Sequence, residues 1–109
     1  MEMPRMSKSS TIIRKGSLPA LHPGAILARE MEACGLSAQA LALKLRVPAN
    51  RISEIVAGRR SISAETALRL GRYFGTGADL WVRLQASYDL AVAEREHGKT
   101  VRREVEAAA

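Results

Sequence analysis

The stretch LSAQALALKLRVPANRISEIVAG, residues 36–58, decides the fold. Ser37 has the short polar side chain that favours a helix N-cap, and Leu41 and Leu45 follow one helical turn apart. Pro48 cannot continue that helix, but it suits the first turn of another one. Gly58 then ends the second helix, because glycine adopts the left-handed conformation at low cost. The stretch predicts two short helices, 38–45 and 48–57, joined by a tight turn.

Two helices joined in this way form the helix-turn-helix pattern, in which the second helix enters the major groove of DNA. The first helix braces the second from behind and crosses the phosphate backbone. The bracing side chains that we expect are apolar and inward: Leu41, Leu45, Ile52 and Ile55. The pattern therefore predicts a DNA-binding protein.

The outward positions near the start of the second helix are the candidate base contacts: Ala49, Asn50, Arg51, Ser53 and Glu54. Asn50 can make paired hydrogen bonds to adenine and Arg51 to guanine, so these two are the preferred base readers. Ser53 is short enough to approach a base or a phosphate. Two interpretations of Glu54 stay open: it accepts a hydrogen bond from cytosine, or it orients its neighbours.

Phosphate contacts are expected on both sides of that helix. Ser37 and Gln39 begin the preceding helix, where polar side chains and free backbone N–H groups can meet a phosphate. Arg59 and Arg60 follow the second helix and would form a further phosphate clamp. The alternative is a plain N-cap for Ser37 and a solvated loop for the two arginines.

Helical periodicity continues on either side of the motif, with helices predicted at 23–34, 63–74 and 78–96. Cys34 ends the apolar face of the first of these, which predicts a small buried hydrophobe. Gly98 is expected to lie just beyond the last helix. Since aromatic residues make up only 4% of the chain and few stretches resemble strands, the prediction is an all-α, five-helix domain.

The 109 residues suffice for one modest core, which we assign to residues 22–97. Residues 1–21 are basic, rich in Ser, Gly and Pro and aperiodic, so a flexible arm is expected there, and a flexible tail is expected at 98–109. Residues 37–72 hold seven basic side chains against two acidic ones, a balance of +5 in a chain of net charge +6. This concentration favours a polyanionic partner, although charge alone would fit a solvated surface equally well.

Composition argues against several other classes of protein. A single cysteine excludes an internal disulfide, and two histidines offer no metal-ligand cluster, so neither a metal nor another cofactor is expected. No nucleophile–base pair, carboxylate dyad or phosphate-binding glycine loop occurs at workable spacing, which indicates neither an enzyme nor a small-molecule substrate. Without a membrane-length apolar run or signal peptide, a cytoplasmic protein is expected.

One helix-turn-helix contacts too little DNA for tight specific binding, so we expect a two-fold dimer that spans half-sites about 34 to 36 Å apart. The last helix is the candidate interface because apolar side chains recur along it: Leu80, Trp81, Leu84 and Tyr88. The alternative, which applies at least in part to Trp81, is that these side chains complete the core of the monomer.

Beyond these patterns, several motifs resemble the HigA antitoxins over roughly residues 18–97: His22-Pro23-Gly24, RISEIV at 51–56, TALRLGRYFG at 66–75, Leu80-Trp81, Leu84-Gln85-Ala86 and Tyr88-Asp89-Leu90. The resemblance implies a five-helix fold of the lambda-repressor type and a homodimer on a palindromic operator in its own promoter. It also implies neutralisation of a HigB toxin, a ribosome-dependent mRNA endonuclease of the RelE-like class.

Two turn positions depart from the family, which often has glycine where this chain has Arg46 and asparagine where it has Ala57. A left-handed Arg46 would cost about 1 kcal/mol, and it would add positive charge near the groove.

Three functional hypotheses follow, of which the antitoxin and repressor is favoured. A stand-alone regulator without a toxin partner would bind DNA in the same way, whereas a protein-binding adaptor would have kept the fold and lost DNA binding. A basic toxin would bind preferentially to an acidic surface, such as the one that carries Glu30 and Glu32 or the acidic last helix.

Overall fold

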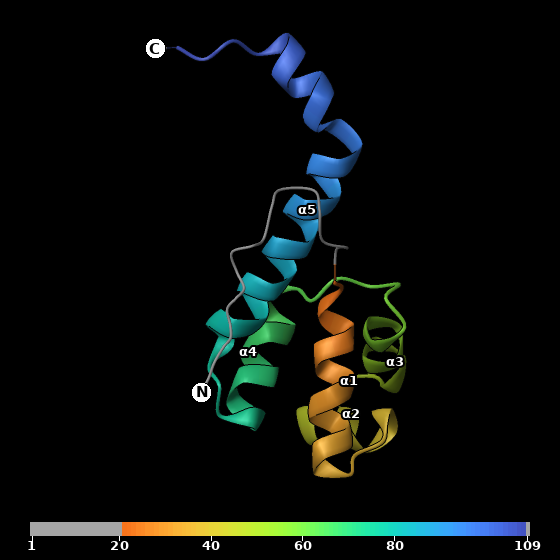
Figure 1. Ribbon diagram of the computed structural model, residues 1–109. Helices are drawn as coiled ribbons and strands as arrows, with labels where there is room; N and C mark the ends of the chain where they lie inside the picture. Colours follow the sequence, from red (N-terminus) through yellow and green to blue (C-terminus); the bar gives the residue numbers. More distant parts are fainter. Residues whose placement is uncertain (1–20, 109) are drawn as a thin grey trace, which may run out of the picture. The chain divides into compact units, whose positions relative to one another are not determined.

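The computed structural model describes residues 21–108, and within them the secondary structure is entirely helical. The five helices are α1 (Pro23–Cys34), α2 (Ala38–Leu45), α3 (Ala49–Val56), α4 (Ala64–Phe74) and α5 (Ala78–Glu104) (Figure 1). The predicted all-α, five-helix class is confirmed. Of the expected N-terminal arm, residues 1–20 lie outside the described part of the chain. Within that part, every helix is too short or too polar to cross a membrane.

Local capping residues set where the helices begin and end. Ser37 and Ser63 are the N-caps of α2 and α4, and their hydroxyl oxygens accept hydrogen bonds from the backbone N–H groups of Ala40 and Thr66. Gly35 follows α1 in the left-handed conformation, with φ 68°. These are the positions at which sequence patterns predicted the boundaries, so the predicted starts of α2 and α4 and the end of α1 are confirmed.

The turn between α2 and α3 contains the one non-glycine residue with positive φ in the described chain, Arg46, at φ 62° and ψ 46°. A side chain in this conformation costs about 1 kcal/mol relative to glycine. Ala57 instead ends α3 with φ −78°, and Gly58 after it takes φ 80°. The chain therefore needs no asparagine at position 57, because the left-handed residue stands one position later.

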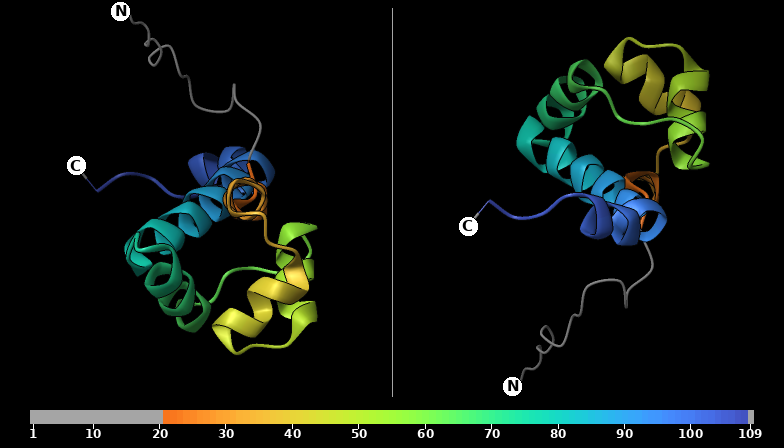
Figure 2. Two further views of the ribbon diagram at one scale, coloured as in Figure 1. Left: turned by 90° about the horizontal axis from the view of Figure 1, so that it is seen from below. Right: turned by 90° about the horizontal axis from the view of Figure 1, so that it is seen from above.

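The described residues form two compact units, Leu21–Asp89 and residues 90–108, whose boundary falls within α5. The core of the first unit is apolar, and its largest fully buried side chains include Trp81, Leu27, Leu41, Ile52, Ile55 and Leu70. Both views of Figure 2 show α2 and α3 side by side. All four predicted bracing residues, Leu41, Leu45, Ile52 and Ile55, are buried between and behind these helices.

Two glycines permit close approach of the backbone within this unit. A Cβ atom on Gly24 would collide with the carbonyl oxygen of Ile55, so α1 lies directly against the end of α3. A Cβ atom on Gly71 would collide with the backbone of Gly77, in the turn before α5. Both helix contacts therefore depend on the absence of a side chain rather than on its presence.

Two sequence predictions are wrong at helix ends. Cys34 is exposed rather than buried, because α1 ends there and Leu36, after the turn, packs against the core in its place. The last helix does not stop near Glu96 but continues to Glu104, with Gly98 in its interior. Glu94 lies over Gly98 and forms an ion pair of 2.6 Å with Arg102, which spans the glycine and supports the helix on both sides of it.

Candidate nucleic-acid interface

Helix α3 presents one apolar and one polar face. Ile52 and Ile55 are fully buried, whereas Asn50, Ser53 and Ala57 are exposed at intervals of three and four residues, which places them along one side of the helix. Ser53 Oγ donates to the Asn50 carbonyl oxygen over 3.3 Å, and the Asn50 side-chain amide has no polar partner among the described residues. Ala49 is also exposed. An exposed, unpaired amide is thus available on the surface of α3.

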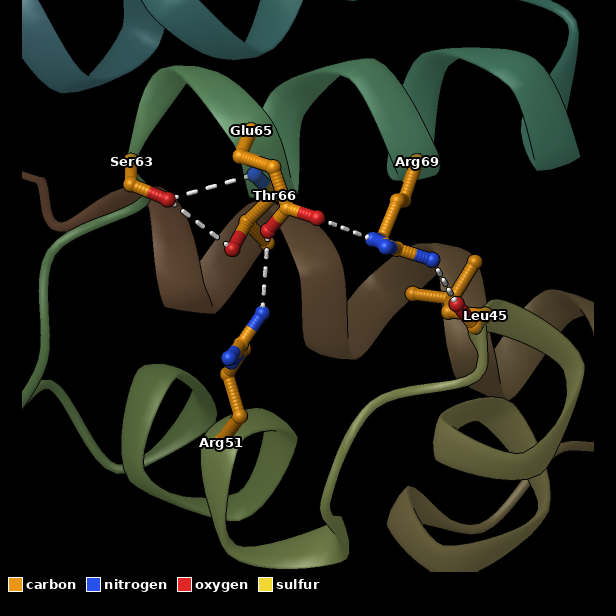
Figure 3. A network of polar contacts seen from close by, with 6 residues as sticks. All are labelled: Leu45, Arg51, Ser63, Glu65, Thr66 and Arg69. Carbon is orange, nitrogen blue, oxygen red and sulfur yellow. Dashed lines mark hydrogen bonds and ion pairs between the residues drawn. The ribbon is translucent and has the colours of Figure 1, made fainter.

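Arg51, the other preferred base reader, lies at the flank of α3 and not on that face. Its side chain is 28% exposed and extends toward α4, where Nη1 donates to Glu65 Oε1 over 3.2 Å (Figure 3). The structure therefore places the two neighbours in different surroundings: Asn50 faces solvent, and Arg51 is engaged within the chain.

Glu65 belongs to a network that connects three helices (Figure 3). Its second oxygen, Oε2, accepts from Arg69 Nε over 2.6 Å, and Arg69 Nη1 donates to the Leu45 carbonyl oxygen over 2.9 Å. Leu45 is the last residue of α2, where carbonyl groups lack partners within the helix. The network therefore joins the end of α2, the start of α3 and the first turn of α4.

The charge state of Glu65 follows from these contacts. The hydrogen bond from Arg69 is the largest cause and lowers the pKa of Glu65. Desolvation raises the pKa, but the positive charges of Arg69 and Arg51 act with the hydrogen bond, so the net direction is downward. The carboxylate is consequently ionised throughout the neutral range, and both ion pairs are present there.

Glu54 and Arg60 form a further ion pair toward the other end of α3. Arg60 Nε and Nη2 lie 2.8 and 2.7 Å from Glu54 Oε1. This contact matches the interpretation in which Glu54 orients a neighbour. Arg59, beside it, is exposed and makes no side-chain hydrogen bond or ion pair within residues 21–108. Only one of the two arginines in the predicted clamp is therefore unpaired in the described chain.

The start of α2 and the turn after it border α3. Ser37 and Gln39 are exposed, and the Ser37 hydroxyl oxygen accepts from the Ala40 backbone N–H over 3.0 Å. The plain N-cap is thus present, which leaves a phosphate contact by Ser37 as a prediction. Arg46 is exposed and, within the described chain, its guanidinium has no partner. Arg46 and Arg59 place positive charge at the two ends of α3.

The residues predicted for a dimer interface are not equally accessible. Leu80 is 40% exposed, and Leu84 and Tyr88 are half-buried. Trp81 is fully buried in the core of its own chain, where its Nε1–H donates to Thr76 Oγ1 over 3.0 Å and its ring lies 6.1 Å from that of Phe74. The prediction of Trp81 as an interface residue is corrected on this ground, because a side chain without accessible surface cannot meet a second subunit.

Two supporting residues were missed by sequence reasoning. Gln85 is buried, and its Oε1 accepts from the Ile62 backbone N–H over 2.8 Å, which fixes the loop between Arg60 and α4. A polar residue at the same helical spacing as Trp81 and Tyr88 was the available signal. His22 caps α1: its Nδ1 accepts from the Gly24 N–H over 2.9 Å, and its ring meets Tyr88 edge-on. A histidine directly before a proline gave no specific signal for this cap.

Comparison with known proteins extends this description. The family described as Helix-turn-helix matches residues 27–81. Virulence-associated protein I of Dichelobacter nodosus is 52% identical over 83 residues, which cover 75% of this chain and 77% of that protein. A HigA-family addiction module antidote protein of Coxiella burnetii has a similar structure, with a TM-score of 0.80, 43% identity and coverage of 83% and 99% of the two chains. The antitoxin HigA of Pseudomonas aeruginosa, solved with the higBA promoter, gives a TM-score of 0.81, 42% identity and coverage of 84% and 100%.

Proposed function

Because the chain belongs to the helix-turn-helix family, which is not a family of enzymes, and resembles HigA antitoxins over most of its length, we propose that it is a HigA-type antitoxin. In this role it binds its own operator as a homodimer, represses transcription in the cytoplasm and neutralises a HigB-type mRNA endonuclease. The single observation that carries the DNA-binding part is the exposed polar face of α3, with Asn50 and Ser53 side by side along it.

The proposed DNA contacts follow from exposure and pairing. Asn50 reads a base in the major groove, and Ala49 and Ser53 line the same face. Ser37 and Gln39 at the start of α2 bind phosphate together with Arg46 and Arg59, whose charges are unpaired in the described chain. Arg51 is paired with Glu65, and Arg60 is paired with Glu54. When DNA binds, each of these ion pairs either persists or is replaced by a contact with DNA. The structure of the Pseudomonas aeruginosa antitoxin HigA with the higBA promoter supports DNA binding as a function of this fold.

Dimerisation is proposed through the exposed side of the first half of α5. Leu80 is exposed there, and the half-buried Leu84 and Tyr88 follow at intervals of four residues on the same side of the helix. Two copies that associate in this way would double the contacts to DNA, which tight specific binding requires.

Neutralisation of a toxin is proposed to use a different surface from DNA binding. Glu30 and Glu32 are exposed on α1, and an endonuclease that binds RNA carries positive charge that such a surface attracts. Charge reversal at both positions, followed by co-purification with the product of the adjacent reading frame, tests this: loss of the complex supports the site, and unchanged binding excludes it.

The alternative function is a stand-alone regulator, and it is favoured if no neighbouring frame encodes a small basic protein.

The DNA-binding function is tested by a gel shift with the chain's own promoter and a scrambled duplex at several salt concentrations. A helix-turn-helix repressor is expected to prefer the promoter by about 10³-fold or more, with an affinity that falls steeply as salt rises. Equal, weak binding to both duplexes would instead favour a protein-binding adaptor of the same fold.

A further inference from the structure

We propose that Glu65 is a positioning residue for DNA specificity: it holds the Arg51 guanidinium in one orientation at the flank of α3. The inference rests on the proposed DNA-binding function and adds to it a determinant that lies outside α2 and α3. Glu65 is in the first turn of α4, and its carboxylate bridges Arg51 and Arg69 (Figure 3).

The position of Arg51 on α3 makes its orientation dependent on a partner. Successive residues of an α-helix are rotated by about 100°, so Arg51 cannot project in the direction of Asn50, which faces solvent. The backbone directs Arg51 to the side of α3 near α4, and its side chain is 28% exposed. Whether its guanidinium reaches DNA therefore depends on how the side chain is held and not on the helix face alone.

The carboxylate that holds Arg51 is itself fixed. Glu65 Oε2 accepts from Arg69 Nε over 2.6 Å, and Arg69 is anchored in turn by the Leu45 carbonyl oxygen at 2.9 Å. The buried Thr66 and the N-cap Ser63 fix the backbone beside Glu65. Arg51 is thus connected through Glu65 and Arg69, by three hydrogen bonds in series, to the end of α2, the helix that braces α3.

This pairing affects what Arg51 can do on DNA. Glu65 engages Nη1, and among the described residues it is the only polar partner of the Arg51 side chain, so Nε and Nη2 remain as donors. A guanidinium whose direction is already set loses less conformational entropy when it binds a matching site. Glu65 also offsets the charge of Arg51, which reduces its attraction to phosphates of any sequence. Both effects raise the preference for the correct operator.

The test measures the specificity ratio, the Kd for a scrambled duplex divided by the Kd for the promoter, by fluorescence anisotropy. We expect Glu65→Gln to lower this ratio about five- to tenfold, through weaker promoter binding and tighter binding to the scrambled duplex. On the scrambled duplex, the slope of log affinity against log salt should steepen by about 0.9, as one more cation meets a phosphate. In an Arg51→Ala background, Glu65→Gln should not change the ratio further.

Two variants separate orientation from charge and folding. Glu106→Gln makes the same charge change on an exposed residue that follows α5 and should leave the ratio unchanged. Arg51→Lys keeps the charge but lacks the planar guanidinium, so it should lower the ratio as Glu65→Gln does. Because Glu65 is 54% exposed, its variant is expected to keep its helical circular dichroism.

A wild-type ratio in the Glu65→Gln protein would overturn the inference, as would an equal loss in the Arg51→Ala background. If the wild-type chain itself fails to distinguish the promoter from the scrambled duplex, the proposed DNA-binding function fails, and the role of Glu65 fails with it. The two failures are therefore distinguished by the wild-type measurement.

Discussion

Asn50 and Arg51 are neighbours in the sequence, yet they meet different surroundings. The Asn50 amide is exposed and has no partner within residues 21–108, whereas Arg51 is paired with Glu65 on another helix. Their residue types predicted that both read bases, because an amide can form paired hydrogen bonds with adenine and a guanidinium can form them with guanine. In the fold, one of them has an exposed, unpaired amide and the other is held by an ion pair.

Replacement of Asn50 by alanine is expected to weaken binding to the promoter by about 1 to 3 kcal/mol, which is roughly five- to 150-fold, because a paired hydrogen bond to a base is lost. Binding to a scrambled duplex should hardly change. The thermal midpoint should stay within about 2 °C of wild type, since exposed substitutions have small effects on stability. Anisotropy and thermal melts measure both effects.

The matched control is Cys34→Ala, an uncharged truncation at an exposed position of α1. It should leave both DNA affinity and stability unchanged. A promoter affinity in the Asn50→Ala protein equal to that of the Cys34→Ala protein would remove Asn50 from the set of base readers.

Glu65 gives a second prediction at this scale, on pH. Its pKa is lowered in the folded chain, so its ion pairs stabilise the fold above the pKa of the unfolded carboxyl, about 4.3, and this contribution is lost as pH falls through the lower folded value. Wild type and Glu65→Gln should therefore differ in thermal midpoint at pH 7 and converge in acid. A difference that does not shrink as the pH falls through the acid range would contradict the assigned cause.

At the scale of helices, close approach of backbones matters as much as apolar contact. Helix α1 meets the end of α3 at Gly24, and α4 meets the turn before α5 at Gly71, and in both places a Cβ atom would collide with backbone. Since backbone cannot move aside as a flexible side chain can, these contacts set how closely α1 supports α3 from behind.

Gly24→Ala should consequently destabilise the fold by about 1 to 3 kcal/mol, which for a domain of this size lowers the thermal midpoint by roughly 5 °C or more. Gly98→Ala is the matched control, because there the three atoms nearest to the added methyl group all belong to the flexible Glu94 carboxylate. The better helix propensity of alanine, about 1 kcal/mol, should offset that contact. Equal midpoints for the two variants would show that the α1–α3 approach is not tight.

The helices show what could be predicted from sequence and what could not. Starts and stops followed from local residues, since Ser37, Ser63 and Gly35 satisfy or end a helix by their own chemistry. The end of α5 was missed, because the ion pair of Glu94 and Arg102 supports the helix across Gly98. Likewise, the Glu65 network joins residues far apart in the chain, and no periodicity reveals such a contact.

At the scale of the whole molecule, the proposed dimer decides how two copies of α3 meet one duplex. The exposed apolar surface at the start of α5 is the candidate for this contact, with Leu80 as its most accessible member among the proposed residues. Trp81 belongs to the core instead, so the interface is expected to be smaller than the apolar pattern of α5 suggested.

Leu80→Glu should shift the chain from dimer to monomer in sedimentation-velocity experiments, because a charge in an apolar interface lacks a partner. Operator affinity should fall at least about tenfold as the second half-site is lost. Leu43→Glu makes the same change at a leucine of α2 that is 72% exposed and should leave the dimer intact. A Leu80→Glu protein that sediments as the wild type does would exclude this surface.

The most direct test of the DNA interface is titration of the ¹⁵N-labelled chain with its promoter duplex, followed by NMR. We predict that the largest changes in amide chemical shift fall on Asn50, Ser53 and their neighbours in α3, with smaller changes at the start of α2 and at Arg59. Amides of α1 around Glu30 should change least. Large shifts on α1 with an unchanged α3 would contradict the assignment of α3 as the helix that reads DNA.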